Sequence, residues 1–280
     1  MLIDTHCHLN FKAFEGKVGQ IIENAKKAGV EKIIVPGARL DSSEKAIELS
    51  QKYKKVYAAV GIHPVHVGKV KSQKSKVKTE LKKLAGNKKV VAIGECGLDY
   101  FRIENPLQRA GRQKSEIKEK QKQLFKIQIE LAQELDLPLI IHNRNASKDI
   151  LEIIDYVAIR SSNHLKGVFH CFLGNFTLLK WALEHGFYIG VDGNITYSKH
   201  VKKVVKRTPL RNLLIETDSP YLMPEPIRRT EKFPNEPKNV KIVAEKIAEI
   251  KGDYFLNIAK KTTDNAERLF WKNEITTLRS

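Results

Sequence analysis

Two stretches, VVAIGE at residues 90–95 and LPLIIH at residues 137–142, are the clearest indicators of the fold. Each is an unbroken apolar run rather than an alternation of apolar and polar residues, which is typical of a parallel strand buried on both faces. Each also ends in a residue that can bind a metal, Glu95 in the first stretch and His142 in the second. The pattern therefore predicts buried parallel strands that carry polar side chains at their carboxyl ends.

Similar apolar runs recur along the chain and give eight strand candidates in all, at residues 2–6, 32–37, 56–62, 90–95, 137–142, 167–171, 188–192 and 213–217. Amphipathic stretches such as GQIIENAKKAG (19–29) and KQLFKIQIELAQEL (122–135) separate them. This alternation predicts an α/β fold, and eight units in 280 residues match a (β/α)₈ TIM barrel. A Pro-rich loop at 219–237 and two helices, near 239–251 and 253–270, follow the last strand. No linker divides the chain, so we expect a single domain over residues 1–280.

The sequence argues against a membrane-spanning and a secreted protein and favours a cytoplasmic one. No run of 18 or more apolar residues exists, so we expect no membrane span. The N-terminus lacks a basic segment followed by an apolar stretch, so no secretory signal is expected. Three cysteines without regular spacing argue against a disulfide framework and favour a reducing compartment. We therefore expect a cytoplasmic protein, and a monomer.

The formal charge of +18 is concentrated in two segments. Residues 69–89 carry nine lysines and one acidic residue, and residues 102–126 carry eight basic and three acidic residues. Such segments form either solvated helix faces or a surface for a polyanion such as nucleic acid. Charge alone does not separate these two interpretations.

The polar residues at the strand ends predict a metal site, because barrels of this class gather their active sites there. His6 and His8 flank a single residue of an extended segment, so both rings point to the same side. Five of the nine histidines lie at or just beyond a strand end. The ligands expected to converge are His6, His8, Glu95, His142, His170 and Asp218. Six ligands are too many for one tetrahedral zinc and suit two metals that share a bridging carboxylate.

Strand alternation also predicts the direction of the neighbouring side chains. Cys7, Cys96 and Cys171 each adjoin a proposed ligand, so alternation points their thiols away from the mouth, as buried packing residues. Asp4 and Glu216 lie two residues before His6 and Asp218 and should point inward, one layer below the metals.

Each of these two acids is then placed to accept the free ring N–H of a histidine ligand. Arg144 has the same phase as His142 and is positioned for an anionic substrate. His63 ends the third strand and is not needed as a ligand; it can contact a phosphate, transfer a proton or be structural.

At this point the chain resembles the TatD-related metal-dependent deoxyribonucleases, which are amidohydrolase-like TIM barrels. The resemblance is carried, in the family's order from residue 2 to about 270, by IDTHCHLN, VGIHP, AIGECGLDYFR, LPLIIHNR, HCFLG, YIGVDGNITYSK, LLIETDSPYLMPEP and NEP…NV. It implies that Glu95 bridges the metals and that His63 lies near the bound phosphate. The chain departs from the family in a basic segment at 69–76, in a longer segment at 103–120 and in a longer loop at 228–237 that lacks the usual glycine.

The resemblance implies hydrolysis of phosphodiester bonds in DNA, with exonuclease action on single-stranded ends. Two divalent ions, of magnesium, manganese or zinc, would be the cofactors. Glu95, Asp218 and His63 would be catalytic, with Asp218 taking the proton of the attacking water, and His63 and Arg144 would bind substrate. Hydrolysis of the ester in D-aminoacyl-tRNA needs the same metals and the same basic surface, so it stays open. A non-catalytic nucleic-acid-binding protein is the third alternative, which six convergent ligands disfavour.

Overall fold

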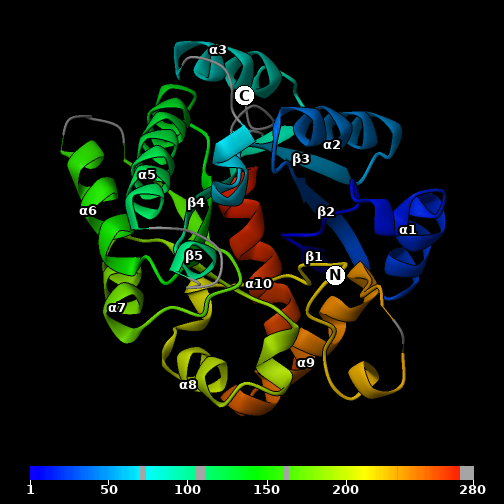
Figure 1. Ribbon diagram of the computed structural model, residues 1–280. Coiled ribbons are helices and arrows are strands. Elements are labelled where there is room, and N and C mark those ends of the chain that lie inside the picture. The colour runs from blue at the N-terminus through cyan, green and yellow to red at the C-terminus, as the bar shows by residue number, and fades with distance from the viewer. Residues whose placement is uncertain (70–73, 105–110, 160–163, 232, 272–280) are drawn as a thin grey trace, which may run out of the picture.

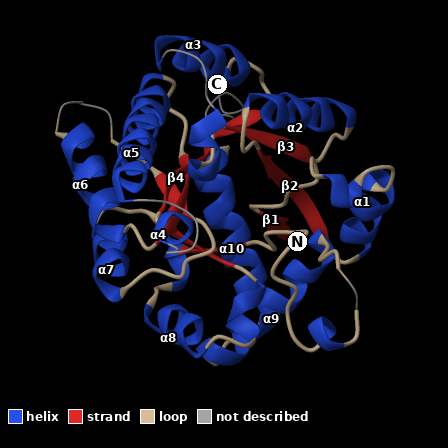
Figure 2. Ribbon diagram, viewed as in Figure 1, coloured by secondary structure: helices blue, strands red, loops and turns tan. Residues whose placement is uncertain are grey.

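The predicted barrel is confirmed by a computed structural model, which describes residues 1–69, 74–104, 111–159, 164–231 and 233–271 (Figure 1). Eight parallel strands are hydrogen-bonded in chain order from β1 to β8. Their bounds are β1 Leu2–Asp4, β2 Val30–Pro36, β3 Val56–Val60, β4 Val90–Asp99, β5 Leu139–Arg144, β6 Gly167–Phe169, β7 Tyr188–Val191 and β8 Leu213–Ile215. Figure 2 shows these strands inside a ring of helices.

The helices follow the strands and bury one apolar face against them. Their bounds are α1 Val18–Lys27, α2 Leu40–Lys52, α3 Lys74–Ala85, α4 Phe101–Glu104, α5 Gly111–Glu134, α6 Ser147–Ala158, α7 Phe176–Glu184, α8 Lys199–Arg207, α9 Val240–Lys251 and α10 Phe255–Phe270. Helix α8 illustrates the pattern: the Ser198 hydroxyl accepts from the Val201 backbone N–H at its start, and Val201, Val204 and Val205 are buried. The two helices predicted after the last strand are confirmed as α9 and α10.

The first and last strands meet through a short series of contacts rather than a long ladder. The Thr5 N–H donates to Ile215 O (3.2 Å), the Asp218 N–H to His6 O (2.9 Å) and the His8 N–H to Ser219 O (2.7 Å). Cys7 and Ser219 form a parallel bridge. These contacts close the ring of strands and set the segment after β1 beside the segment after β8.

Two apolar clusters fill the structure. The larger lies between the strands and the surrounding helices. The smaller joins inward-facing strand residues, such as Ile34, Ala92 and Ile140, to Leu269 and Trp271 at the end of α10 and just beyond it. Helix α10 is therefore a plug for the barrel interior, and it is seen through the ring in Figure 1. The carboxyl ends of the strands are left for the polar residues.

The structure differs from the sequence interpretation at several segment ends. Strand β1 is shorter than expected, whereas β4 runs four residues past Glu95. In the basic segment 69–76, α3 begins at residue 74. Residues 70–73 lie outside the described residues, as do residues 105–110 of the second basic segment. Within the described ranges, no helix has the length and apolar content needed to cross a membrane.

Candidate metal centre

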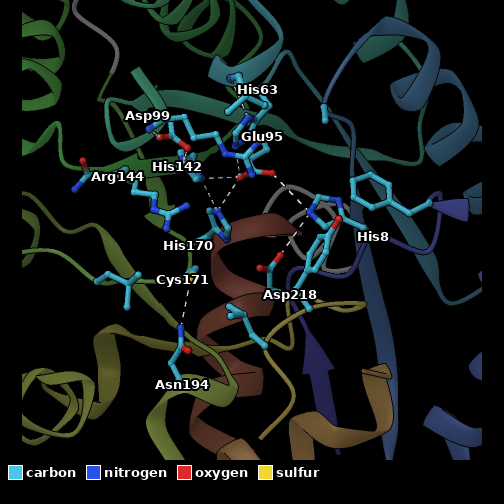
Figure 3. Close-up of a pocket in the computed structure, with 18 of the residues that line it drawn as sticks. His8, His63, Glu95, Asp99, His142, Arg144, His170, Cys171, Asn194 and Asp218 are labelled. Carbon is cyan, nitrogen blue, oxygen red and sulfur yellow. Dashed lines mark hydrogen bonds and ion pairs between the residues drawn. The ribbon is translucent and has the colours of Figure 1, made fainter. Parts of the chain in front are cut away.

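A cavity of about 730 Å³ opens at the carboxyl ends of the strands. Figure 3 shows the side chains that converge there from different strands. Five of the six predicted ligands line the cavity: His8, Glu95, His142, His170 and Asp218. His6 lies just beneath it, fully buried, with its ring stacked on that of His170 at a centroid distance of 3.9 Å. The structure thus brings all six together.

The first ligand group surrounds one oxygen of Glu95. His6 Nε2 lies 3.2 Å from His8 Nε2, 3.6 Å from Glu95 Oε2 and 3.7 Å from Asp218 Oδ1. His8 Nε2 lies 3.7 Å from Glu95 Oε2 and 3.5 Å from Asp218 Oδ1. Zinc bonds of about 2.0–2.2 Å in a regular tetrahedron place ligand atoms about 3.3–3.6 Å apart. These four side chains therefore fit one four-coordinate cation.

The second group surrounds the other oxygen of the same carboxylate. Glu95 Oε1 lies 2.8 Å from His170 Nε2, 3.0 Å from His142 Nδ1 and 3.2 Å from His63 Nε2. His142 Nδ1 and His170 Nε2 are 3.4 Å apart. Glu95 thus presents one oxygen to each group. His63, which the sequence interpretation did not require as a ligand, supplies a third nitrogen here.

The electrostatics suit ligands of a cation. Burial opposes charge on Glu95, but His63 and His170, with hydrogen bonds from His142 and His170, hold its pKa well below the ordinary value. Burial likewise opposes charge on Asp218, but His8 and His6 lower its pKa. Both groups are therefore carboxylates at neutral pH, the form that binds metal.

The histidines beside Glu95 titrate differently from one another. Burial lowers the pKa of His63 to about 4, so its ring is neutral at pH 7. Burial also disfavours charge on His170, but Glu95 and Glu216 together raise the pKa of that ring well above its ordinary value.

In the first group, His6 Nε2 and His8 Nε2 face each other at 3.2 Å, with ring planes at 83°. A cation between two such nitrogens satisfies both lone pairs, so the donor set fits a metal.

Asp99 is a candidate functional residue that the sequence interpretation did not identify. Its Oδ2 lies 3.3 Å from His142 Nε2, on the ring edge opposite Glu95. A carboxylate there accepts the Nε2–H and leaves the Nδ1 lone pair free for a metal. Asp99 reaches this position because β4 continues past Glu95 along β5. A side chain at Gly97 (φ 132°) would put its Cβ 2.0 Å from His142 O, so only glycine permits this approach.

The two acids predicted beneath the metals have different partners from those expected. Asp4 does not contact a histidine ring: its carboxylate accepts from the Thr217 hydroxyl (2.6 Å), the Thr217 N–H (3.0 Å) and the His6 backbone N–H (3.3 Å). Asp4 therefore ties the segment after β8 to β1, close to the first ligand group.

Glu216 comes nearer to the expected role. Its Oε1 lies 3.7 Å from His170 Nδ1 and accepts from the Cys171 backbone N–H. Gly190 in β7 leaves room for this carboxylate, since a Cβ at that position would lie 2.6 Å from Glu216 Oε2. Glu216 therefore orients the ligand-bearing segment that follows β6.

The prediction for the cysteines holds at two positions and is wrong at the third. Cys7 and Cys96 are fully buried within the larger apolar cluster. Cys171 instead lines the cavity, with Asn194 Nδ2 3.8 Å from its sulfur (Figure 3). Strand β6 ends at Phe169 and Cys171 has φ 45°, so strand alternation no longer applies there. Among the described residues, the groups of side chains spaced for a metal contain histidine and carboxylates without cysteine.

Arg144 lines the cavity on the side of β4 and β5, across from His8 (Figure 3). Its guanidinium carbon lies 3.9 Å from the centroid of the Phe101 ring. Stacking on an aromatic face holds a guanidinium in one orientation while its N–H groups stay available. Arg144 is thus a fixed cation beside the ligand groups.

The comparisons with known proteins agree with this geometry. A family model described as TatD related DNase matches residues 3–271 of the chain. The chain belongs to this family.

Relatives within the TatD family cover nearly the whole chain. The uncharacterized metal-dependent hydrolase YabD of Bacillus subtilis is 40% identical over 272 residues, which are 96% of this chain and 99% of YabD. Deoxyribonuclease TATDN3 of Homo sapiens is 33% identical over 277 residues, covering 97% of this chain and 95% of its own length. The crystal structure of YjjV, a TatD homologue from Escherichia coli, has a TM-score of 0.81 at 30% identity, covering 96% and 97% of the two chains. This protein is therefore a metal-dependent hydrolase of the TatD family.

Proposed function

We propose that this hydrolase cleaves phosphodiester bonds of DNA, as an exonuclease on single-stranded ends, with two divalent ions in the metal centre. The observation that carries the proposal is the placing of the two Glu95 oxygens, one in each ligand group, within 3.7 Å of five histidine nitrogens. Two-metal sites of this kind are common in phosphodiester hydrolysis. A human relative also carries the name deoxyribonuclease.

The chain's own residues have distinct tasks in this proposal. His6, His8, Glu95 and Asp218 would hold one ion, and Glu95, His142 and His170 the other. When bound, the pair would polarise a phosphoryl oxygen and lower the pKa of a water at the site.

Three side chains act on the attacking water or on the substrate. The Asp218 side chain reaches the cavity, and its lowered pKa leaves it ionised to accept the proton of the attacking water. The Arg144 guanidinium faces the same cavity and binds a neighbouring phosphate. His63 is neutral and its Nδ1 accepts from the Val65 backbone N–H (3.2 Å), so its proton lies on Nε2, which faces the ligand groups and can donate to a phosphate oxygen.

The test is a product assay on end-labelled single-stranded DNA and on D-aminoacyl-tRNA, with protein loaded in turn with magnesium, manganese and zinc. We expect stepwise release of nucleotides from the DNA. Glu95→Ala and Asp218→Ala should each nearly abolish it while far-UV circular dichroism stays that of the barrel. Glu152→Ala, an exposed acid on α6, is the matched control and should behave as wild type.

Three results would contradict the proposal. Activity of Glu95→Ala within a few-fold of wild type would exclude the shared-carboxylate centre. Release of free D-amino acid without nucleotide release would identify a deacylase. No turnover of either substrate, combined with tight DNA binding, would leave a binding protein.

A further inference from the structure

Three aromatic side chains lie in a row beside the metal centre. The Phe11 ring stacks on the ligand His8 at a centroid distance of 4.3 Å and an interplanar angle of 13°. The Tyr221 ring centroid lies 6.4 Å from that of Phe11, and the Phe233 ring centroid lies 6.3 Å from that of Tyr221. We call Phe11, Tyr221 and Phe233 the aromatic ladder. It begins at a metal ligand and leads away from it.

The outer part of the aromatic ladder is exposed. Tyr221 is 50% exposed and lines the cavity, and Phe233 is 62% exposed. Large aromatic side chains gain most from burial, so a continuous row left open beside an active-site cavity needs a reason. A ligand with flat faces that covers these rings supplies one.

The aromatic ladder is also held in place relative to the metal centre. The Tyr221 N–H donates to the carbonyl oxygen of the ligand Asp218 (2.9 Å). The buried Asn235 amide donates to Tyr221 O (2.7 Å) and to Thr217 O (3.2 Å), so both ends of the loop that carries Tyr221 are fixed. Rings on a fixed loop bind a flat partner with little ordering of their own.

The ring angles decide how such a partner can bind. Adjacent rings of the aromatic ladder are inclined at 72° and 42°, so they form a stepped platform rather than a parallel-sided slot. A base would stack on an open face of Tyr221 or Phe233, not between two rings. The stacked Arg144 faces the same cavity from the side opposite His8 (Figure 3).

We infer that the aromatic ladder is a base-stacking subsite for single-stranded DNA, with Tyr221 and Phe233 holding unpaired bases next to the scissile phosphate. The inference rests on the proposed function and adds to it the reason for a single strand. In a duplex the base faces are covered by their neighbours, whereas unpaired bases offer them freely. With bases on the aromatic ladder and a backbone phosphate at Arg144, the strand would cross the metal centre between them.

The test compares equilibrium binding of two strands to the metal-loaded protein by fluorescence anisotropy. Both strands have a phosphorothioate backbone that resists hydrolysis, and one has abasic sites in place of its terminal nucleosides. For wild type we expect the abasic strand to bind at least about fivefold more weakly per missing base. The double variant Tyr221→Ala/Phe233→Ala should bind both strands equally, and as weakly as wild type binds the abasic strand.

Two variants make the result specific. Tyr221→Phe keeps the ring and should retain the preference for intact bases. Tyr254→Ala removes a tyrosine that is 84% exposed at the start of α10, outside the cavity lining, and should match wild type. Equal binding of both strands by wild type would overturn the inference, as would a preference that survives in the double variant. Tighter binding of a blunt duplex, or of RNA of the same sequence, would overturn single-stranded DNA as the ligand.

The outcome separates this inference from the proposed function. Base-dependent binding without hydrolysis of any strand would refute the nuclease and leave the subsite. Hydrolysis that proceeds with base-independent binding would refute the subsite and leave the nuclease.

Discussion

Replacing Asn235 by alanine should be among the more destabilising single changes in this structure, although the residue belongs to a loop. Its side chain is 1% exposed and makes four hydrogen bonds. It donates to Thr217 O and Tyr221 O, and its Oδ1 accepts from Asn239 Nδ2 (2.8 Å) and the Glu236 N–H (2.9 Å). The variant removes all four at once.

The expected magnitude follows from which partners stay buried. Thr217 and Asn239 are 1% and 5% exposed, so Thr217 O and Asn239 Nδ2 would lose a partner without access to water. Each such loss costs about 1–3 kcal/mol. Tyr221 is half exposed, so its carbonyl can bind water instead. We therefore expect Asn235→Ala to lower the free energy of unfolding by about 3–4 kcal/mol, a large part of the 5–15 kcal/mol typical of folded proteins.

The measurement is urea unfolding followed by circular dichroism and by tryptophan fluorescence, whose transitions should coincide if unfolding is two-state. The midpoint should fall with the m-value unchanged. Asn257→Ala is the control: Asn257 is exposed in α10, and its bond to Asp253 (2.6 Å) lies at the surface, so the change should stay within about 0.5 kcal/mol. A loss below about 1 kcal/mol for Asn235→Ala would refute the reasoning, since the buried partners would then have found other bonds.

Further predictions concern a thiol, an ion pair and a glycine. Burial raises the pKa of both Cys171 and Cys96, so alkylation needs alkaline conditions; there, mass spectrometry of the native protein should find Cys171, which lines the cavity, modified ahead of the fully buried Cys96. Asp149 accepts a hydrogen bond from the Tyr100 hydroxyl (2.6 Å) and pairs with Lys122 (2.8 Å). Burial opposes the charge of Asp149, but these two partners lower its pKa. The charged carboxylate therefore stabilises the fold above about pH 4, and this stabilisation is lost as pH falls through the lowered pKa. Asp149→Asn should thus cost about 1–2 kcal/mol at neutral pH and less in acid, as measured by unfolding at several pH values. Gly190→Ala would place a methyl group 2.6 Å from Glu216 Oε2 and should lower the free energy of unfolding by about 1–3 kcal/mol. In the same assay the control Gly68→Ala, whose methyl group would meet open space, should lower it far less.

The barrel, and the convergence of the six candidate ligands at its mouth, could be predicted from the sequence because both depend on simple periodic rules. Continuous apolar runs mark strands buried on both faces, and parallel strands bring their carboxyl ends to one rim. The sequence therefore places His142 and Asp218 at the same rim although 76 positions separate them, by the difference of their numbers.

Side-chain positions and partners could not be predicted where the backbone departs from regular strand alternation. Cys171 follows the end of β6 with φ 45°, a conformation that apolar periodicity does not reveal. Asp99 was missed because β4 continues past an irregularity in its pairing with β5, so a strand expected to stop at Glu95 carries a second acid to His142. The partners of Asp4 could not be inferred because an inward phase does not say whether a carboxylate meets a ring or a backbone amide. The aromatic ladder depends on loop geometry, which no periodic pattern in the sequence reveals.

The contacts that close the ring between β1 and β8 impose an order on assembly. They join residues 4–8 to residues 215–219, pairs separated by more than two hundred positions, such as Asp4 and Thr217 at a separation of 213. A chain emerging during synthesis can build β1 to β7 with their helices, but the outer edge of β1 stays without its partner until β8 has been made. Pairings of such long range form slowly, and an unpaired strand edge invites association with other chains. Because His6 and His8 lie on one side of this closure and Asp218 on the other, the first ligand group comes into existence only when the ring closes, so capacity to bind metal there should report closure of the barrel.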